Sequence, residues 1–477
     1  MKAPFSDYLN SLVPGFRRLL DLLEADYDYV SILSTDSKGL AVRISQQSKS
    51  VSNQTMTTER GTVIRVYKDG LYSEYACSAF DPDRPEETAD ALRKTVNEQL
   101  ALLKGCGCPV YETGILADEP LQLLVEKETQ LLPEEVPLSD LVSRLTEISD
   151  RGMDGSEYML DCIANAQSTH ICKLFLTKNR YLRQSYVYSE GNIIPVLGRD
   201  GQNKIGYVSV SGLGGPELFE GLDEKLDDAV KSGLEMLDAD RIIPGEYEII
   251  TSPEVSGLIA HEAFGHGVEM DMFVKGRALG AEYIDRRVGS ELVTMHEGAL
   301  CADNVTSYAF DDEGTLAGDV IEIQHGILKA GICDALSALR LGITPTGNGK
   351  RENFEHKVYT RMTNTIFDSG SDSLEDMIRS VKYGYLLEGM ESGMEDPKHW
   401  GIQCILQMGR EIREGKLTGK VVSPVIMTGY VPDLLSNITM ASTDRKVFGS
   451  GGCGKGHKEW VKVSDGGPYL KTTGRLG

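Results

Sequence analysis

Alternating apolar and polar residues, the pattern of half-buried strands, recur throughout the first 240 residues. This pattern predicts strands at Tyr29–Leu33, Leu40–Ile44, Thr62–Tyr67, Leu71–Cys77, Ile171–Leu176, Leu182–Tyr188 and Ile205–Val210. Apolar residues spaced three or four positions apart predict helices instead. These helices are expected at Phe16–Glu24 and Pro85–Lys104, from about Asp140, from about Glu157, and at Asp223–Leu237. Helices and strands are grouped rather than strictly alternating, which favours an α+β layer.

The pattern changes between Asp238 and Gly245, where a Pro-Gly pair interrupts both periodicities. One helix follows, and then many short strand signals separated by glycine, for example Val320–Ile323, Val421–Met427 and Trp460–Val463. A chain of 477 residues is also too long for a single core. We therefore expect an α+β protein of two domains. Residues 1–240 would form an α/β layered domain, and residues 241–477 a β-rich barrel- or sandwich-like domain that carries the helix.

Composition and charge reduce the number of functions and locations that we expect for the chain. The formal net charge of −23 repels phosphate backbones, so we expect no nucleic-acid partner. No apolar run reaches about 18 residues, so we expect no membrane span. The first residues lack the apolar region of a secretory signal, and nine cysteines without a regular framework fit reduced thiols, so we expect a cytoplasmic protein. The one close pair, Cys106 and Cys108, is expected to lie in a turn rather than to bind metal.

The helix of the second half has a clear beginning. Ser252 is a candidate N-cap, Pro253 suits the first helical position, and Glu254 places an acid in the first turn. The residues that follow form an apolar stripe at helical spacing, which would bury the segment in a core.

Residues 261–266 on this helix read H-E-x-x-x-H, one residue longer than the H-E-x-x-H of ordinary zinc peptidases. Positions five apart lie roughly 140° around a regular α-helix, so His261 and His266 would not converge on one ion. A local π-type turn would bring both imidazoles to one face, and Gly265 and Gly267 lower the barrier to it. Two histidines and a glutamate could also meet by chance on a buried helix. With only 8 histidines in the chain, the metal-site interpretation is favoured.

A catalytic zinc usually has three protein ligands and a water, so a third ligand is needed. No third histidine follows at the spacing of metzincins. A downstream glutamate, Glu282, Glu291 or Glu297, could serve. Cys453 is the other candidate, because flanking glycines allow close approach and Lys455 would favour the thiolate. The alternative for Cys453 is a free thiol in a flexible loop.

These segments resemble the TldD/PmbA metallopeptidases, also called modulators of DNA gyrase, and specifically the catalytic TldD-like subunit. The resemblance covers nearly the full length. It is carried by residues 261–271, by F-D-D-E-G-T at 310–315, by R-M-T-N-T at 361–365, by C-G-K at 453–455 and by the strand at 61–67. The long histidine motif is the most specific of these segments.

The resemblance implies a zinc-dependent metallopeptidase acting on short or unfolded peptides. One Zn²⁺ per active chain would be held by His261, His266 and Cys453, with Glu262 as the general base. The enzyme would work inside a dimeric cavity, as a homodimer or with a related chain that lacks the histidine motif.

Two further residues are candidates for substrate contact. Relatives commonly continue the C-G-K segment with Gly-Gln, whereas His457 follows Gly456 here, so His457 is a possible extra polar group near the substrate. A substrate could also pair as an added strand along a sheet edge. The segment Gly466–Lys471 is a candidate edge, because prolines such as Pro468 mark edge strands.

Three other functions are compatible with the sequence. The chain could be a zinc amidohydrolase acting on a non-peptide amide, a non-catalytic scaffold or regulatory subunit, or a regulator that contacts topoisomerases. The intact Glu262 argues against the scaffold, because binding alone does not need a base beside the metal.

Overall fold

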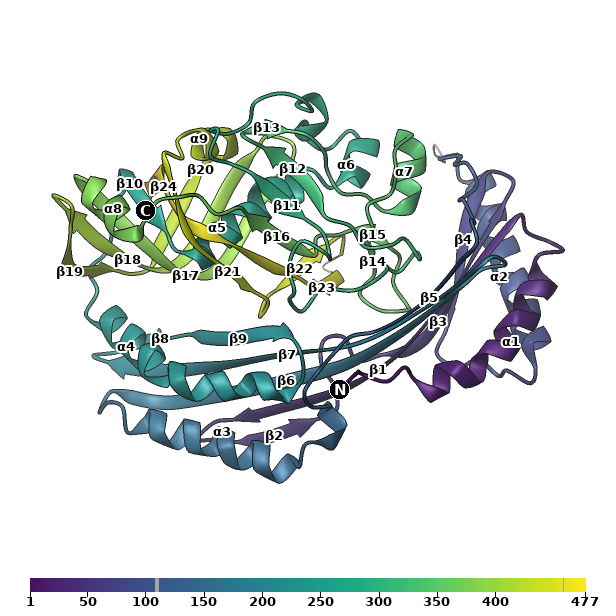
Figure 1. The fold of residues 1–477 in the computed structure, drawn as a ribbon, viewed down its shortest axis with the longest axis horizontal. Helices are drawn as coiled ribbons and strands as arrows, with labels where there is room; N and C mark the ends of the chain where they lie inside the picture. The colour runs from purple at the N-terminus through teal and green to yellow at the C-terminus, as the bar shows by residue number, and fades with distance from the viewer. Residues whose placement is uncertain (108–110, 458) are drawn as a thin grey trace.

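The computed structural model describes residues 1–107, 111–457 and 459–477, and two large β-sheets organise them (Figure 1). The first sheet has nine strands, all before Leu213, and the second has eleven strands, all from Gly245 onward. The domain boundary that we expect at residue 240 lies between these two groups and stays a prediction. None of the helices in the described ranges is long and apolar enough to cross a membrane. Cys106 is exposed at the end of a helix, and Cys108 lies outside the described residues.

The first sheet has the strand order β4-β3-β1-β6-β7-β5, with β2, β8 and β9 paired to its long strands. All neighbouring strands are antiparallel except β5 and β7. Its strands are β1 (Tyr29–Ile44), β2 (Lys49–Ser52), β3 (Arg60–Lys68), β4 (Leu71–Cys77), β5 (Leu121–Glu126), β6 (Met159–Leu176), β7 (Arg180–Arg199), β8 (Gln202–Ile205) and β9 (Val208–Leu213).

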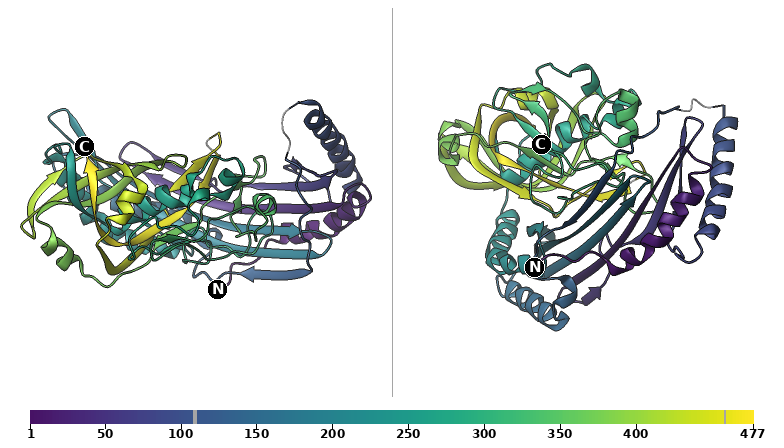
Figure 2. Two further views of the ribbon diagram at one scale, coloured as in Figure 1. Left: turned by 90° about the horizontal axis from the view of Figure 1, so that it is seen from above. Right: turned by 45° about the vertical axis from the view of Figure 1, so that its right-hand side comes forward.

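Two pairs of helices pack against opposite ends of the long strands (Figure 2). The first pair shares a core with Ile32 and Ile64, and the second pair shares a core with Ile44 and Ala164. The helices are α1 (Asp7–Leu23) and α2 (Pro85–Gly105) in the first pair, α3 (Leu138–Met153) and α4 (Leu226–Leu237) in the second, with the short 3₁₀-helices η1 (Pro133–Glu135) and η2 (Pro216–Lys225) before α3 and α4.

The second sheet contains a closed five-stranded barrel. Strands β10, β17, β18, β20 and β24 follow one another, and β24 pairs back with β10 to close the ring. Strands β16, β11, β12 and β13 extend the sheet from β24, and β19 and β21 pair with β18 and β24. The strands are β10 (Gly245–Thr251), β11 (Met295–Glu297), β12 (Val320–Gln324), β13 (Ile327–Leu328), β16 (Asn364–Phe367), β17 (Tyr383–Asp396), β18 (Gly401–Arg413), β19 (Lys416–Val422), β20 (Val425–Tyr430), β21 (Met440–Phe448) and β24 (Ser464–Leu476).

Two small hairpins and several short helices complete this half. The hairpins are β14 (Gly349–Lys350) with β15 (Tyr359–Thr360), and β22 (Gly452–Lys455) with β23 (Glu459–Lys462). The helices are α5 (Pro253–Ala260), the π-helix η3 (His261–Gly265), α6 (Met270–Val274), η4 (Leu279–Glu282), α7 (Ala335–Leu341), α8 (Leu374–Ser380) and α9 (Val431–Ser436). Helix α5 is buried in the same core as the barrel strands. The expected α+β class, with a β-rich barrel that carries the motif helix, is therefore confirmed.

Three sequence-based elements are wrong. The strand expected at Ile205–Val210 is divided between the end of β8 and the start of β9. The helix expected from about Glu157 is strand β6, in which Cys162, Ala164 and Ala166 are buried by a period of two. The small residues there suit a helix, but pairing with β1 on one side and β7 on the other decides the structure. The strand expected at Val421–Met427 is interrupted, because β19 ends before a cis peptide bond to Pro424 and β20 begins after it.

The predicted edge at Gly466–Lys471 is also wrong. These residues belong to β24, which pairs with β10, β16, β20 and β21 and so lies inside the sheet. Pro468 is buried opposite Arg445, next to a register irregularity in β21. A proline has no N–H for the ladder, and a bulge in the neighbouring strand is another place where a sheet tolerates it.

A loop at residues 310–315, which we call the sheet-bridging loop, joins the two halves. Glu313 forms an ion pair with Arg65 of β3, and Asp312 forms one with Lys173 of β6. Asp311 accepts backbone N–H groups from Glu313, Thr315 and Gly349, which fixes the shape of the loop. The F-D-D-E-G-T segment therefore connects the two sheets through buried charges.

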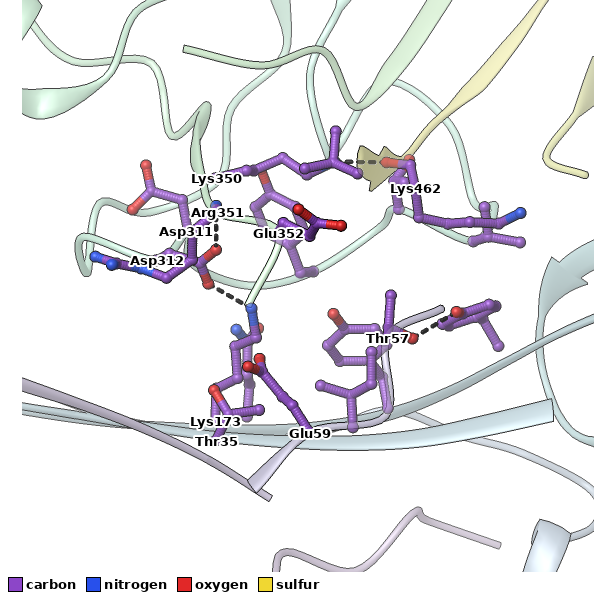
Figure 3. Close-up of a pocket in the computed structure, with 18 of the residues that line it drawn as sticks. Thr35, Thr57, Glu59, Lys173, Asp311, Asp312, Lys350, Arg351, Glu352 and Lys462 are labelled. Carbon is purple, nitrogen blue, oxygen red and sulfur yellow. Dashed lines mark hydrogen bonds and ion pairs between the residues drawn. The ribbon is translucent and has the colours of Figure 1, made fainter. Parts of the chain in front are cut away.

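A cavity of about 60 Å³ lies beside this loop, between the two sheets (Figure 3). Its wall includes Lys173, Asp312 and Lys350. The Nζ of Lys350 donates to the carbonyls of Met362 and Lys462 at 3.0 and 2.7 Å. Burial lowers the pKa of Lys350 to about 7. Lys350 thereby ties the chain before β16 to the end of β23.

Candidate metal centre

Helix α5 carries the histidine motif into the barrel core. The Ser252 side chain accepts the N–H of Val255 and Pro253 begins the helix, as the sequence predicts. Residues 261–265 then form a π-helix, in which the backbone N–H of His266 donates to the carbonyl of His261. This i→i+5 bond adds one residue to the turn. The π-type turn expected from the spacing of the histidines is confirmed.

The π-helix places the two imidazoles side by side. The ring centroids of His261 and His266 are 5.1 Å apart, with the ring planes at 86°. Gly265 gives this arrangement room, because a Cβ there would lie 2.4 Å from Sδ of Met362, and the methionine or the turn would have to move. Gly267 has more room, since a Cβ there would have its nearest neighbour at 3.5 Å.

Cys453 lies next to the two histidines. It comes from β22, and its Sγ is 3.2 Å from Nε2 of His266. One donor atom from each of His261, His266 and Cys453 lies within 4.8 Å of the other two. The barrel fold thus brings together residues that are 187 positions apart in the chain.

This donor set fits a zinc ion. Zn–N bonds of about 2.0–2.1 Å and Zn–S bonds of about 2.3 Å place tetrahedral donors roughly 3.3–3.6 Å apart, close to the Cys453–His266 separation. Two imidazoles and a thiolate are also ligands that zinc accepts readily.

The three side chains are electrostatically coupled. Burial alone would raise the pKa of the Cys453 thiol, but the neighbouring His266 and His261 lower it well below its usual value. Burial alone would lower the pKa of His266, but Cys453 and Glu269 raise it well above its usual value. The cluster therefore favours a thiolate, the form of cysteine that binds metal.

Glu269 supports His266 from behind. Its Oε2 lies 3.1 Å from Nδ1 of His266, so the ring presents Nε2 toward Cys453. Burial alone would raise the pKa of Glu269, but Lys455 and His266 lower it to about 2. A carboxylate on the second ring nitrogen fixes the tautomer of a metal-binding histidine.

Lys455 and Arg361 hold the strand of Cys453 in place. The Nζ of Lys455 is 2.7 Å from Oδ1 of Asp271 and 3.1 Å from Oε2 of Glu269. The guanidinium of Arg361, which is fully buried, donates to the carbonyl of Cys453 at 2.6 Å. The C-G-K and R-M-T-N-T segments thus position the thiol.

Glu262 belongs to the same π-helix, directly after His261. It is buried, and its side chain packs against Gly393 of β17, where a Cβ would come within 2.5 Å of Cγ of Glu262. Gly393 therefore leaves the space that the Glu262 side chain occupies.

Sequence reasoning missed four acids at this site. Glu269 has a local signal, since it follows His266 by three positions. Glu254 has one too, since it lies on the same helix seven positions before His261. Asp465 of β24 and Glu395 of β17 have none, because folding brings them close. Burial raises the pKa of Asp465 to about 7, of Glu254 to about 7 and of Glu395 to about 9.

The alternative third ligands lie elsewhere. Glu282 and Glu291 are exposed, and Glu297 is buried with its oxygens accepting hydrogen bonds from Thr363 and Thr365. No other group of three metal-binding side chains is found among the residues that the structure describes.

The two substrate-contact candidates are not brought into the cluster. His457 is exposed in the turn between β22 and β23. Pro468 is buried inside the second sheet.

Comparison with known proteins gives the family. Residues 244–473 match the model of the PmbA/TldA metallopeptidase C-terminal domain. A metalloprotease of Synechocystis is 25% identical over 458 residues, which are 95% of this chain and 95% of that protein. A protein of Saccharolobus solfataricus named zinc metalloprotease TldD homolog is 31% identical over 230 residues, 48% of this chain and 50% of that protein. Several other relatives are matched over only 52–65% of their length, so the chain spans about half to two thirds of them.

Among solved structures, TldE from Thermococcus kodakarensis has the same fold. The TM-score is 0.73 at 18% identity, over 97% of this chain and 100% of that chain. At this identity the likeness shows the fold alone. The domain match and the metalloprotease relatives place residues 244–473 of this chain in the PmbA/TldD metallopeptidase family.

Proposed function

We propose that this chain is a zinc-dependent metallopeptidase that hydrolyses short or unfolded peptides. The observation that carries the proposal is the group formed by His261, His266 and Cys453, with Glu262 on the same π-helix. The similarity to a protein named zinc metalloprotease TldD homolog supports zinc as the metal.

Each residue has a chemical role in this proposal. His261, His266 and Cys453 would hold one zinc ion, which when bound polarises the scissile carbonyl and acidifies water. Glu262 accepts a proton from the attacking water and returns it to the departing amine. The Cys453 thiolate donates more charge than an imidazole would, which moderates the Lewis acidity of the metal.

The free edge of β17 is the proposed substrate-binding strand. β10 pairs with β17 only from Gly384 to Leu387. Within the described residues, the side of β17 away from β18 has no strand partner from Glu391 to Glu395. Gly393 in this segment packs against Glu262. A peptide added here as a strand would be read mainly through its backbone, and would pass the proposed base.

We further propose that the chain works in the cytoplasm as a dimer, with a second copy or with a related chain that lacks the histidine motif. The family resemblance supports this arrangement, and the fold shared with TldE is compatible with it. Sizing should give a dimer, and peptides or a denatured domain should be cleaved much faster than the same domain when folded. Full activity from a monomer, or equal cleavage of the folded domain, would end the enclosed-dimer proposal.

The general-base proposal is tested with Glu262→Gln. Elemental analysis should give about one zinc per chain in the wild type and in the variant, because the glutamate is not a ligand. Cleavage of a peptide library should fall roughly 10²–10⁴-fold in the variant, the usual contribution of a general base. Glu282→Gln, which changes an exposed acid, is the matched control. Loss of zinc together with activity would make Glu262 a ligand or a structural residue instead.

A further inference from the structure

We propose that Asp465 is a positioning residue for His261: when the site holds zinc, the free oxygen of Asp465 accepts a hydrogen bond from the second ring nitrogen. The inference rests on the proposed function, because it assigns a further role within the same metal site. Asp465 lies in β24, the strand that closes the barrel and packs against helix α5.

The two candidate histidine ligands are supported unequally. Nδ1 of His266 has Glu269 at 3.1 Å. Nδ1 of His261 is buried and has no hydrogen-bond partner among the described residues. A histidine that binds metal almost always donates its other N–H to a carboxylate, a carbonyl or water. His261 therefore needs an acceptor that the helix itself does not supply.

Asp465 is an acceptor without a donor. It is buried, at 6% exposure, and its Oδ1 has no partner among the described residues. A Cβ on Gly257 would lie 2.6 Å from this oxygen. Gly257 precedes His261 by four positions, so the two residues share one face of the helix. Burial raises the pKa of Asp465 to about 7, and charge on His261 lowers it, in keeping with this position.

The unpartnered Nδ1 of His261 and the unpartnered Oδ1 of Asp465 are chemically complementary, one a potential N–H donor and the other an acceptor. With Nδ1 protonated, His261 presents Nε2 as its metal-binding atom, in the same tautomer that Glu269 gives His266.

The test combines a measurement of zinc affinity with detection of the imidazole N–H proton of His261 by NMR. Apo protein is titrated with zinc against a competing chelator, for the wild type, Asp465→Asn, Asp465→Glu and Ser464→Ala. The Asn variant should bind zinc about 10–100-fold more weakly, the usual cost of losing such support. The Glu variant should recover part of this loss. Ser464→Ala alters the neighbouring buried residue of β24 and should leave the affinity unchanged.

Proton NMR of histidine-labelled, zinc-loaded protein provides the second readout. The wild type should show a slowly exchanging, downfield imidazole N–H signal for His261 as well as for His266, and Asp465→Asn should lose the His261 signal. Wild-type affinity in the Asn variant, or no such signal for His261 in the wild type, overturns the inference. The wild-type spectrum decides the matter even if the Asn variant fails to fold. A wild type that binds no zinc overturns the proposed function as well. Tight zinc binding that is unchanged by substitution of Asp465 overturns only this inference.

Discussion

The thiol of Cys453 is positioned by its neighbours more than by its own strand. Residues two apart on a strand share a face, so Lys455 points the same way as Cys453. Its ammonium lies between Asp271 and Glu269, which follow the histidine motif. The ion pairs thus set the register of β22 against the motif helix, and the thiol is placed opposite His266 as a result.

Replacement of Cys453 tests this residue directly. Cys453→Ala should lose stoichiometric zinc at neutral pH, because two imidazoles alone make an incomplete zinc site. The measurement is elemental analysis after gel filtration, with Cys106→Ala, an exposed thiol, as the control. Zinc that stays at one per chain in Cys453→Ala would assign the third ligand to a carboxylate.

At the scale of the element, the π-helix depends on one glycine. Gly265→Ala would place a Cβ against Sδ of Met362, and either the π-turn or the methionine must move. We expect zinc affinity to fall at least tenfold, because the two imidazoles would no longer converge. Gly267→Ala, on the other side of His266, meets only ordinary contacts and is the matched control. Equal zinc affinities in the two variants would contradict the role given to Gly265.

A second element-scale prediction concerns His170, which ties β6 to η1. Its Nδ1 is 3.0 Å from Oε1 of Glu134. Burial alone would lower the pKa of His170, but hydrogen bonds to Cys172 and Glu134 raise it to about 9. Since the folded pKa exceeds the unfolded value of about 6.5, the stabilisation is complete below pH 6.5 and disappears as the pH rises through 9.

Urea unfolding of the wild type and of His170→Gln at several pH values measures this effect. Between pH 6.5 and 10, the free energy of unfolding of the wild type should fall by roughly 1–2 kcal/mol more than that of the variant, after allowance for the half-exposed Glu134. If the free energy of unfolding of the two proteins changed with pH in the same way, His170 would not titrate as described.

Elements with local signals were predictable from the sequence, and elements decided by long-range pairing were not. Ser252 and Pro253 mark the start of α5, and the five-residue histidine spacing predicts the π-turn. The segment from Met159 to Ala166 contains small residues that suit either structure, and only its partners β1 and β7 make it a strand. Pro468 suggested an edge because the neighbouring irregularity in β21 has no signature in the sequence.

The candidate site divides in the same way. His261, Glu262 and His266 belong to one short segment, so their chemistry could be read directly. Spacing alone left Cys453 open against three glutamates, because nothing in the sequence tells which distant residue meets the helix. Asp465 could not be found, since it reaches the site only when β24 closes the barrel.

At the scale of the whole molecule, buried charges join the two sheets. The side chains of Arg65 and Glu313 are 8% and 1% exposed, and Glu74 is the only other carboxylate paired with Arg65 in the described ranges. Glu313→Gln removes one of the two carboxylates that balance the buried charge of Arg65, so we expect the free energy of unfolding to fall by about 3 kcal/mol.

The control for Glu313→Gln is Asp69→Asn, which removes an exposed pair with Lys104 and should cost less than about 1 kcal/mol. Chemical denaturation measures both variants. A similarly small fall in the free energy of unfolding of both variants would mean that the sheet-bridging loop contributes little to stability.

The return of β24 to β10 has a consequence for how the protein is made. The motif helix leaves the ribosome long before Cys453, which follows His266 by 187 positions, and before the strand that closes the ring. At roughly 5–20 residues per second, this interval lasts on the order of 10–40 s. Throughout it, the nascent chain carries both histidines and the glutamate but neither the thiol nor the closing strand. We therefore expect the proposed hydrolytic capacity to arise only after Cys453 and β24 have been synthesised, which keeps a growing polypeptide from attacking itself or its neighbours on the same messenger.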